Sequence, residues 1–111
     1  MSHYADYRLE CYNIHTFEDD HGFFAVKSHD DDTRLHIEDM WVKPKFRDKK
    51  IGQEYQDKIF KYAKENNYKK VSCSVYVHNK HANETLAKFL HNKWKLAWNN
   101  GDYIVLIKDV V

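Results

Sequence analysis

Apolar and polar residues alternate in several short stretches of the chain, which is the period-2 pattern of half-buried strands. Aromatic and β-branched residues gather from about Tyr7 to Phe17 and from Phe23 to Ser28. The turn residues DDHG separate these two stretches and predict a hairpin. The alternation is cleanest in VSCSVYV, residues 71–77. Near the C-terminus, Trp94–Trp98 and Tyr103–Lys108 flank NNGD and predict a second hairpin.

The stretch RLHIEDMWV contains a shift of phase. Leu35 and Ile37 define one apolar face, whereas Met40 and Val42 continue with the opposite parity. A β-bulge at Glu38–Asp39 would produce this shift, because it inserts one extra residue into the alternation. A strand buried on both faces would produce the same pattern, so two explanations stay open.

Two stretches carry the spacing of amphipathic helices. Ile51, Tyr55, Ile59 and Ala63 recur every four residues, with lysines on the other side. A second helix is predicted from Asn83 to Asn92, with Asn83 as its N-cap. The predicted order is β-β-β-α-β-α-β-β, an α+β fold with a mixed, mostly antiparallel sheet. Its two β-α-β crossings favour neighbouring parallel strands in the middle of that sheet.

Composition fits one small soluble domain, residues 1–111. Acidic and basic residues number 17 and 18, so bulk charge makes nucleic acid an unlikely partner. Cys11 and Cys73 have no CxxC spacing, and a reducing cytoplasm suits them. We find no signal peptide and no apolar run near the ~20 residues of a membrane span. The eight histidines show no HExxH spacing, so we expect no metal ligand.

The strand-to-helix junction IEDMWVKPKFRDKKIG resembles motif A of the GNAT acyltransferase superfamily, whose form is strand, V-x-P-x-[YF]-R-x-x-G-x-G, helix. The matching residues are Val42, Pro44, Phe46, Arg47, Ile51 and Gly52. NETLAKFLHNKWK resembles the motif B that follows in this family. The resemblance covers roughly Thr33 to Lys108, and the predicted element order is that of the family without the two helices that usually follow its first strand.

The resemblance implies an N-acetyltransferase that uses acetyl-CoA. In this family the backbone amides of Asp48, Lys50, Gly52 and Gln53 would hold the pyrophosphate, because a helix N-terminus offers free N–H groups. Arg47, Lys49 and Lys50 would add positive charge. The implied cofactor-binding residues are Met40, Trp41, Val42, Arg47, Asp48, Lys49, Lys50, Ile51, Gly52, Gln53, Asn79 and Asn83. A solvated basic turn is the alternative interpretation of KPKFRDKK.

Lys50 departs from the family pattern, which has its first motif glycine there. A non-glycine residue at positive φ costs roughly 1–2 kcal/mol. Either φ stays negative and the lysine ammonium reaches a phosphate, or cofactor binding is weakened. The sequence leaves both outcomes open.

Direct attack of an amine on a thioester requires a base, an oxyanion donor and stabilisation of the leaving thiolate. The resemblance points to the backbone N–H of Met40 as the donor. Glu38 is our candidate base, with His36 second, and Asp39 would hold a cationic substrate. A surface carboxylate near the sheet edge is the alternative interpretation of Glu38.

The general acid is missing from its usual place. The family places a tyrosine in motif B, and alignment puts Leu90 at that position, after Phe89. Tyr76, His78 and His91 are the substitutes nearby in sequence. Asn79 would contact the pantetheine arm, and Asn83 competes for the same role.

The acceptor implied by the resemblance is a primary amine: a polyamine, a lysine side chain or a protein N-terminus. Without the two helices, the acceptor cleft would be open, and a homodimer through exposed strands would be one way to close it. The main rival hypothesis is a GNAT-like binding or inhibitor module without turnover. RNA or aminoacyl-tRNA as acceptor ranks third, because the cofactor phosphates already account for the lysines.

Overall fold

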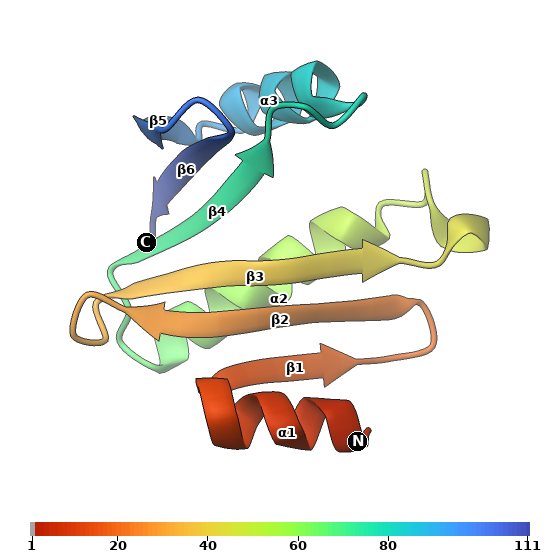
Figure 1. The fold of residues 1–111 in the computed structure, drawn as a ribbon, viewed down its shortest axis with the longest axis vertical. Helices are drawn as coiled ribbons and strands as arrows, with labels where there is room; N and C mark the ends of the chain where they lie inside the picture. The colour runs from red at the N-terminus through yellow and green to blue at the C-terminus, as the bar shows by residue number, and fades with distance from the viewer. Residues whose placement is uncertain (1) are drawn as a thin grey trace.

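The computed structural model describes residues 2–111, which form a six-stranded sheet with three α-helices (Figure 1). The elements are α1 (His3–Tyr12), β1 (Ile14–Glu18), β2 (Gly22–His29), β3 (Arg34–Val42), a 3-10 turn (Pro44–Phe46), α2 (Ile51–Glu65), β4 (Lys70–Tyr76), α3 (Ala82–His91), β5 (Lys95–Asn99) and β6 (Tyr103–Asp109). The predicted α+β class with a mixed, mostly antiparallel sheet is confirmed. None of the helices in residues 2–111 combines the length and apolar character that a membrane crossing demands.

The strand order is β1-β2-β3-β4-β6-β5, and within residues 2–111 only β3 and β4 pair in parallel. Of the two predicted parallel neighbours, the first is confirmed and the second is wrong. The hairpin of β5 and β6 places β6 against β4, and β5 becomes the edge strand. The NNGD turn accounts for the pairing of β5 with β6, because antiparallel pairing of consecutive strands needs only a short connection.

The predicted strand from Tyr7 to Phe17 is wrong in its first half, which is helix α1. Ser2 caps this helix by accepting a hydrogen bond from the Ala5 N–H at 3.1 Å, and Asn13 ends it in the left-handed conformation. Its tyrosines face solvent, so no apolar stripe of helical period marks it in the sequence. Within residues 2–111 no helix follows β1, as expected, but α1, which precedes β1 and packs beside it, was not predicted.

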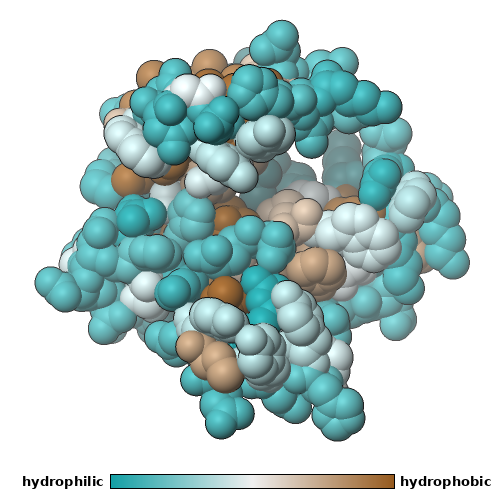
Figure 2. Space-filling model, viewed as in Figure 1, coloured by the Kyte–Doolittle hydropathy of each residue, from teal (hydrophilic) through white to brown (hydrophobic). Residues whose placement is uncertain are grey.

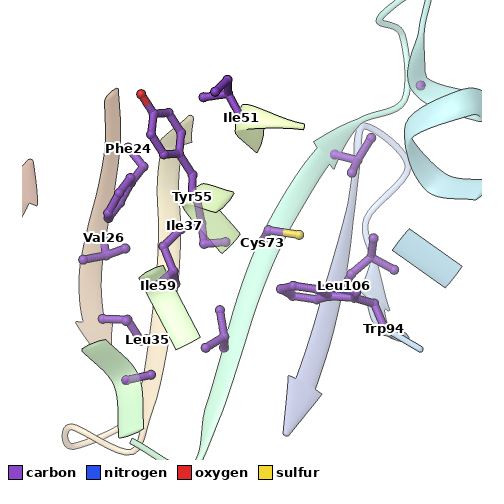
Figure 3. Packing of buried hydrophobic residues seen from close by; sticks show 14 residues of the cluster. Phe24, Val26, Leu35, Ile37, Ile51, Tyr55, Ile59, Cys73, Trp94 and Leu106 are labelled. Atoms are coloured by element: carbon purple, nitrogen blue, oxygen red, sulfur yellow. The ribbon is translucent and has the colours of Figure 1, made fainter. Parts of the chain in front are cut away.

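Helix α2 builds the core with the apolar face predicted for it. Tyr55 and Ile59 lie fully buried between the side chains of β2 and β3 and those of β4 (Figure 3). Trp94, just before β5, and Leu106 of β6 extend the core beneath the other half of the sheet. Packing of this apolar face supplies most of the stability of such a helix. It also fixes the start of α2 beside the end of β3.

Strands β3 and β4 separate before either strand ends. Their pairing stops at Ile37 and Cys73, although β3 runs on to Val42 and β4 to Tyr76 (Figure 1). On the other side of β3, the register against β2 skips Glu38. The skipped residue is a β-bulge, which confirms one of the two explanations of the phase shift. The bulge increases the local twist of β3 at the point where β4 turns away.

Gly22 permits the close approach of β2 to the end of β3. A Cβ atom at this position would lie 2.0 Å from the backbone oxygen of Trp41. We expect Gly22→Ala to lower the free energy of unfolding by about 2–4 kcal/mol, because backbone must move to relieve the clash. Urea unfolding measures this change, and Gly101→Ala is the control, since a Cβ at Gly101 meets no atom within 4 Å. Because the φ of Gly101 is +96°, alanine there is strained but meets no clash, so a larger loss of stability in Gly22→Ala measures the effect of the clash. Equal stability of Gly22→Ala and the wild type would contradict the close packing.

Candidate functional site

A cavity of about 600 Å³ lies between the diverging ends of β3 and β4. Its lining includes Ile37 and Met40 from β3, Val75 from β4, and Phe89 from α3. Figure 2 shows the molecular surface hollowed between these parts of the molecule. Beyond Ile37 one edge of β3 has no strand partner, so its backbone groups can face a ligand. The arrangement offers an apolar channel with free main-chain donors along one wall.

The loop from β3 to α2 has alternating backbone handedness. Asp48 and Lys50 both have φ of 64°, and Lys49 between them is not among the positive-φ residues. Such alternation turns successive N–H groups toward one concave side, which makes an anion-binding nest. Lys50 is also the N-cap of α2. The lysine thus keeps the conformation that the usual glycine would adopt, so the alternative of a negative φ at Lys50 is wrong, and weaker cofactor binding stays a prediction.

Free main-chain donors converge at this loop. Within residues 2–111, no hydrogen bond is formed by the backbone N–H of any residue from 48 to 53, and the first bond of the helix is Glu54 N–H to Lys50 O at 3.1 Å. A Cβ atom at Gly52 would meet no atom within 4 Å. The fold itself therefore has no need of glycine at this position, where glycine costs roughly 0.5–1 kcal/mol relative to alanine. The fold thus leaves room for a ligand to approach the backbone at Gly52.

A second cavity of about 430 Å³ covers these donors. Arg47, Lys50 and Lys88 line it, together with Asp48 and Gly52. Arg47 also lines the cavity between the strands, and its Nε donates to the Val42 carbonyl at 2.9 Å. The two cavities therefore share the Arg47 side chain. Lys49 and Gln53 line neither of these two cavities. The sequence analysis did not identify Lys88, which belongs to α3, far from the loop along the chain.

The strain at Lys50 leads to a stability prediction. Lys50→Gly should raise the free energy of unfolding by about 1 kcal/mol, because relief of 1–2 kcal/mol of left-handed strain exceeds the added chain entropy of glycine. Lys49→Gly is the matched control, since that position is not among the positive-φ residues and offers no such strain to relieve. Urea unfolding of both variants checks the prediction. A loss of stability in Lys50→Gly equal to that in Lys49→Gly would contradict the strain.

His36 and Glu38 lie on the sheet face opposite α2, and Glu38 also lines the cavity between the strands. His36 Nδ1 lies 2.7 Å from Ser72 Oγ, which accepts a hydrogen bond from Arg34 Nη1 at 2.6 Å. Ser72 is fully buried and Arg34 can only donate to it, so we assign the Ser72 hydroxyl proton to His36 Nδ1 and the ring proton to Nε2. Burial lowers the pKa of His36 from 6.5; Glu38 opposes this shift, and Arg34 and His29 add to it. A neutral His36 with this tautomer donates at Nε2, which favours Glu38 as the base.

Asp39 is held by helix α1. Its Oδ2 accepts a hydrogen bond from Arg8 Nη2 at 2.9 Å, and Arg8 is buried. The other carboxylate oxygen of Asp39 forms no hydrogen bond within residues 2–111. Asp39 also lines the cavity between the strands. Met40 packs against the core, whereas Trp41 is exposed. Helix α1 thus fixes one of the carboxylates that line the cavity between the strands.

Of the candidate acids, Tyr76 lines the cavity between the strands. His78 instead binds the Asp102 carboxylate at 3.0 Å, outside the cavity lining. Leu90 is exposed, and Phe89 lines the cavity in its place.

Asn79 also lines the cavity, and its side chain accepts a hydrogen bond from the His81 N–H at 2.9 Å. The prediction of Asn83 as N-cap is wrong. The helix begins at Ala82, His81 is its N-cap without a side-chain bond, and Asn83 is an exposed residue of the first turn. Of the two asparagines, only Asn79 belongs to the cavity lining.

Cys73 lies at the base of the cavity, where β3 and β4 separate. Burial raises the pKa of its thiol to about 12, so it stays protonated at neutral pH. The thiolate is the nucleophilic form of cysteine, and Cys73 is therefore a poor candidate for a covalent acyl carrier. Within residues 2–111, no group of three or more His, Cys, Asp or Glu side chains is placed to hold a metal ion.

Comparison with known protein families gives one match: residues 4–91 match the model described as the acetyltransferase (GNAT) family. Comparison with the curated proteins finds no match. Solved structures with the same fold include Ard1 from Thermoplasma volcanium, at 16% identity and a TM-score of 0.68 over 82% of this chain and 64% of that one.

Two further structures of this fold were determined with coenzyme A ligands. A GNAT family acetyltransferase from Elizabethkingia anophelis with acetyl-CoA bound is 17% identical, with a TM-score of 0.69 over 86% of this chain and 74% of that one. The PaiA N-acetyltransferase from Thermoplasma acidophilum in complex with coenzyme A is 20% identical, with a TM-score of 0.71 over 93% of this chain and 65% of that one. The chain thus spans less than two thirds of the length of Ard1 and PaiA.

Proposed function

We propose, because the chain belongs to the acetyltransferase (GNAT) family, that it transfers an acetyl group from acetyl-CoA to a primary amine. The observation that carries this proposal is the row of free backbone N–H groups from residue 48 to 53. This row includes Gly52, beside which no other protein atom fills the space that a Cβ would take. Acetyl-CoA supplies an activated acetyl thioester and carries a pyrophosphate that suits these donors.

The loop and the start of α2 bind the pyrophosphate in this proposal. The backbone N–H groups of Asp48, Lys50, Gly52 and Gln53 donate to its oxygens, and the helix dipole adds about half a positive charge. The side chains of Arg47 and Lys88 add charge from the walls of the same cavity. Lys49 contributes from the loop at longer range, because its side chain lies outside the lining.

The cavity between β3 and β4 takes the pantetheine arm and the thioester. The edge of β3 from Met40 to Val42, which has no strand partner, offers main-chain groups to the amides of the arm. Asn79, three residues after the end of β4, lines the same cavity. The N–H of Met40 follows the bulge and donates to the acyl oxygen as negative charge grows there. Asn83, exposed on α3, would act only at the outer rim.

Glu38 acts as the base. The bulge projects this residue out of the regular ladder, and Glu38 lines both the cavity between β3 and β4 and a further cavity on the sheet face opposite α2, so it can meet an amine that enters from that face. It accepts the amine proton, directly or through one water, while the nitrogen bonds to the acyl carbon and the carbon–sulfur bond breaks. The free oxygen of Asp39 accepts a second hydrogen bond from the ammonium form of the substrate.

Tyr76 is the residue placed to protonate the leaving sulfur. It lines the cavity between the strands, and its side chain is 45% exposed. The buried, protonated Cys73 makes attack through a covalent acyl-cysteine unfavourable, so direct transfer within a ternary complex fits this cavity best.

Calorimetric titration with acetyl-CoA, followed by a thiol-release assay with a panel of amines, tests this function. The proposal predicts saturable binding and amine-dependent release of free thiol. A protein that ignores acetyl-CoA would favour a binding module of the same fold. A protein that binds acetyl-CoA but never releases thiol with any amine would favour a cofactor-dependent scaffold.

A further inference from the structure

A third cavity, of about 450 Å³, opens on the sheet face opposite α2. Its polar lining includes Arg34 and Glu38, and Trp98, Val105 and Ile107 form an apolar wall. Glu38 also lines the cavity between β3 and β4, so this residue borders both cavities. Nothing in the reaction proposed above uses Arg34 or the apolar wall.

The guanidinium of Arg34 is held in place with one edge free. Its Nε donates to Asp30 Oδ2 at 2.7 Å, and its Nη1 donates to Ser72 Oγ at 2.6 Å. Ser72 is fully buried, and the Arg34 side chain is only 22% exposed. Within residues 2–111, Nη2 forms no hydrogen bond. A half-buried, oriented guanidinium with unused N–H groups suits a carboxylate or phosphate.

The end of this cavity that Arg34 lines has an excess of positive charge on the neighbouring strands. Residues paired across neighbouring strands share a face, and Lys70 pairs with Arg34, Lys27 with His36, and Lys95 with Ile107. The four cations are Arg34, Lys27, Lys70 and Lys95, and two of them form ion pairs with carboxylates. Asp30 binds Arg34, and Asp109 binds Lys70. Asp30 is 61% exposed, so solvent screens its pairing with Arg34. The opposite end of the cavity carries the acidic Glu38.

We propose that the acceptor is a primary amine that also carries an anionic group, and that Arg34 binds this group while the amine meets Glu38. This inference rests on the proposed acetyl transfer. The Cα atoms of Arg34 and Glu38 lie about 13 Å apart, from four residues at ~3.3 Å each. Glu38 bends back to 3.5 Å from His29, the cross-strand partner of Arg34, so the two charges are closer than that. An ω-amino acid or a short peptide has this span, and its hydrocarbon part packs on Trp98.

Three acceptors of equal length test the proposal: 6-aminohexanoate, hexylamine and 1,6-diaminohexane. The wild type should acetylate 6-aminohexanoate with the highest kcat/KM. Arg34→Gln should raise the KM for 6-aminohexanoate at least about tenfold, as expected for a lost charge-assisted hydrogen bond, and leave hexylamine unchanged. Arg34→Lys, which keeps the charge, should recover part of the loss. Lys64→Gln is the control, because it removes an exposed charge from α2, on the other face of the sheet and outside every cavity described.

Calorimetry of 6-aminohexanoate with the protein–coenzyme A complex separates this inference from the proposed function. Binding that Arg34→Gln abolishes would support the anion subsite even if no thiol were released, and the missing thiol would then refute acetyl transfer alone. A preference for 1,6-diaminohexane, or equal affinity for hexylamine and 6-aminohexanoate, would overturn the anion subsite while leaving acetyl transfer in place.

Discussion

Replacement of Gly52 by aspartate is expected to abolish acetyl-CoA binding without unfolding the protein. The new side chain would enter the open space above the first turn of α2, where a Cβ meets no protein atom within 4 Å. There it would place a carboxylate against the pyrophosphate, and like charges brought together cost several kcal/mol. We expect the affinity to fall at least about 100-fold, since each ~1.4 kcal/mol is a factor of ten. Calorimetric titration measures the loss.

Gln56→Asp is the matched control for this prediction. It adds the same carboxylate to α2 one turn later, outside the cavity lined by Gly52. Gly52→Ala separates charge from size, because alanine fits the folded protein and removes only the closest approach to the backbone. Unchanged affinity in Gly52→Asp, with a cooperative unfolding transition retained, would refute the pyrophosphate assignment.

Glu38→Gln is expected to reduce kcat by ~10²–10⁴-fold, the range for loss of a positioned general base. The amide has nearly the shape of the carboxylate but cannot take the proton of the amine. Affinity for acetyl-CoA should change little, because the donors that hold the pyrophosphate lie on the loop before α2. Steady-state kinetics over a range of acceptor concentrations, together with calorimetry, distinguishes the two effects.

Glu84→Gln provides the comparison for Glu38→Gln, since Glu84 is an exposed carboxylate in the first turn of α3 and lines none of the described cavities. His36→Gln should reduce kcat less than Glu38→Gln, because the tautomer set by Ser72 makes His36 a donor at Nε2. A normal kcat in Glu38→Gln combined with a large loss in His36→Gln would move the base to His36.

The fold class could be predicted from the sequence because its signals are local. The four-residue spacing from Ile51 to Ala63 identified α2, and NNGD identified the last hairpin. The phase shift located the bulge at Glu38, although the pattern alone could not exclude a strand buried on both faces. That choice needed the register against β2, which depends on pairing with a distant segment.

Helix α1 could not be predicted in the same way, because its apolar residues follow no stripe and its buried positions are Ala5 and Arg8. A buried arginine is unexpected until its partner, Asp39, is brought close by the fold. Likewise, the order of β5 and β6 depends on which strand of the hairpin reaches β4. These features come from long-range contacts, which leave no mark in a short window of sequence.

The motif from Val42 to Gly52 pointed to the loop before α2, and the roles of its residues remain predictions. The geometry adds two things that the motif could not give: the left-handed conformation of Lys50, and the positions of Lys88 and Arg34. Lys88 belongs to α3, far along the chain from the motif, and Arg34 lies eight residues before Val42 at the start of β3. Single lysines and arginines are too common on surfaces to mark a site in the sequence.

A structure of the protein crystallised with acetyl-CoA tests the central claim most directly. The account predicts diphosphate oxygens within hydrogen-bond distance of the N–H groups of Asp48, Lys50, Gly52 and Gln53, with the acyl group between β3 and β4 beside Glu38. Crystals in which acetyl-CoA leaves these donors empty, or binds elsewhere on the molecule, would contradict it.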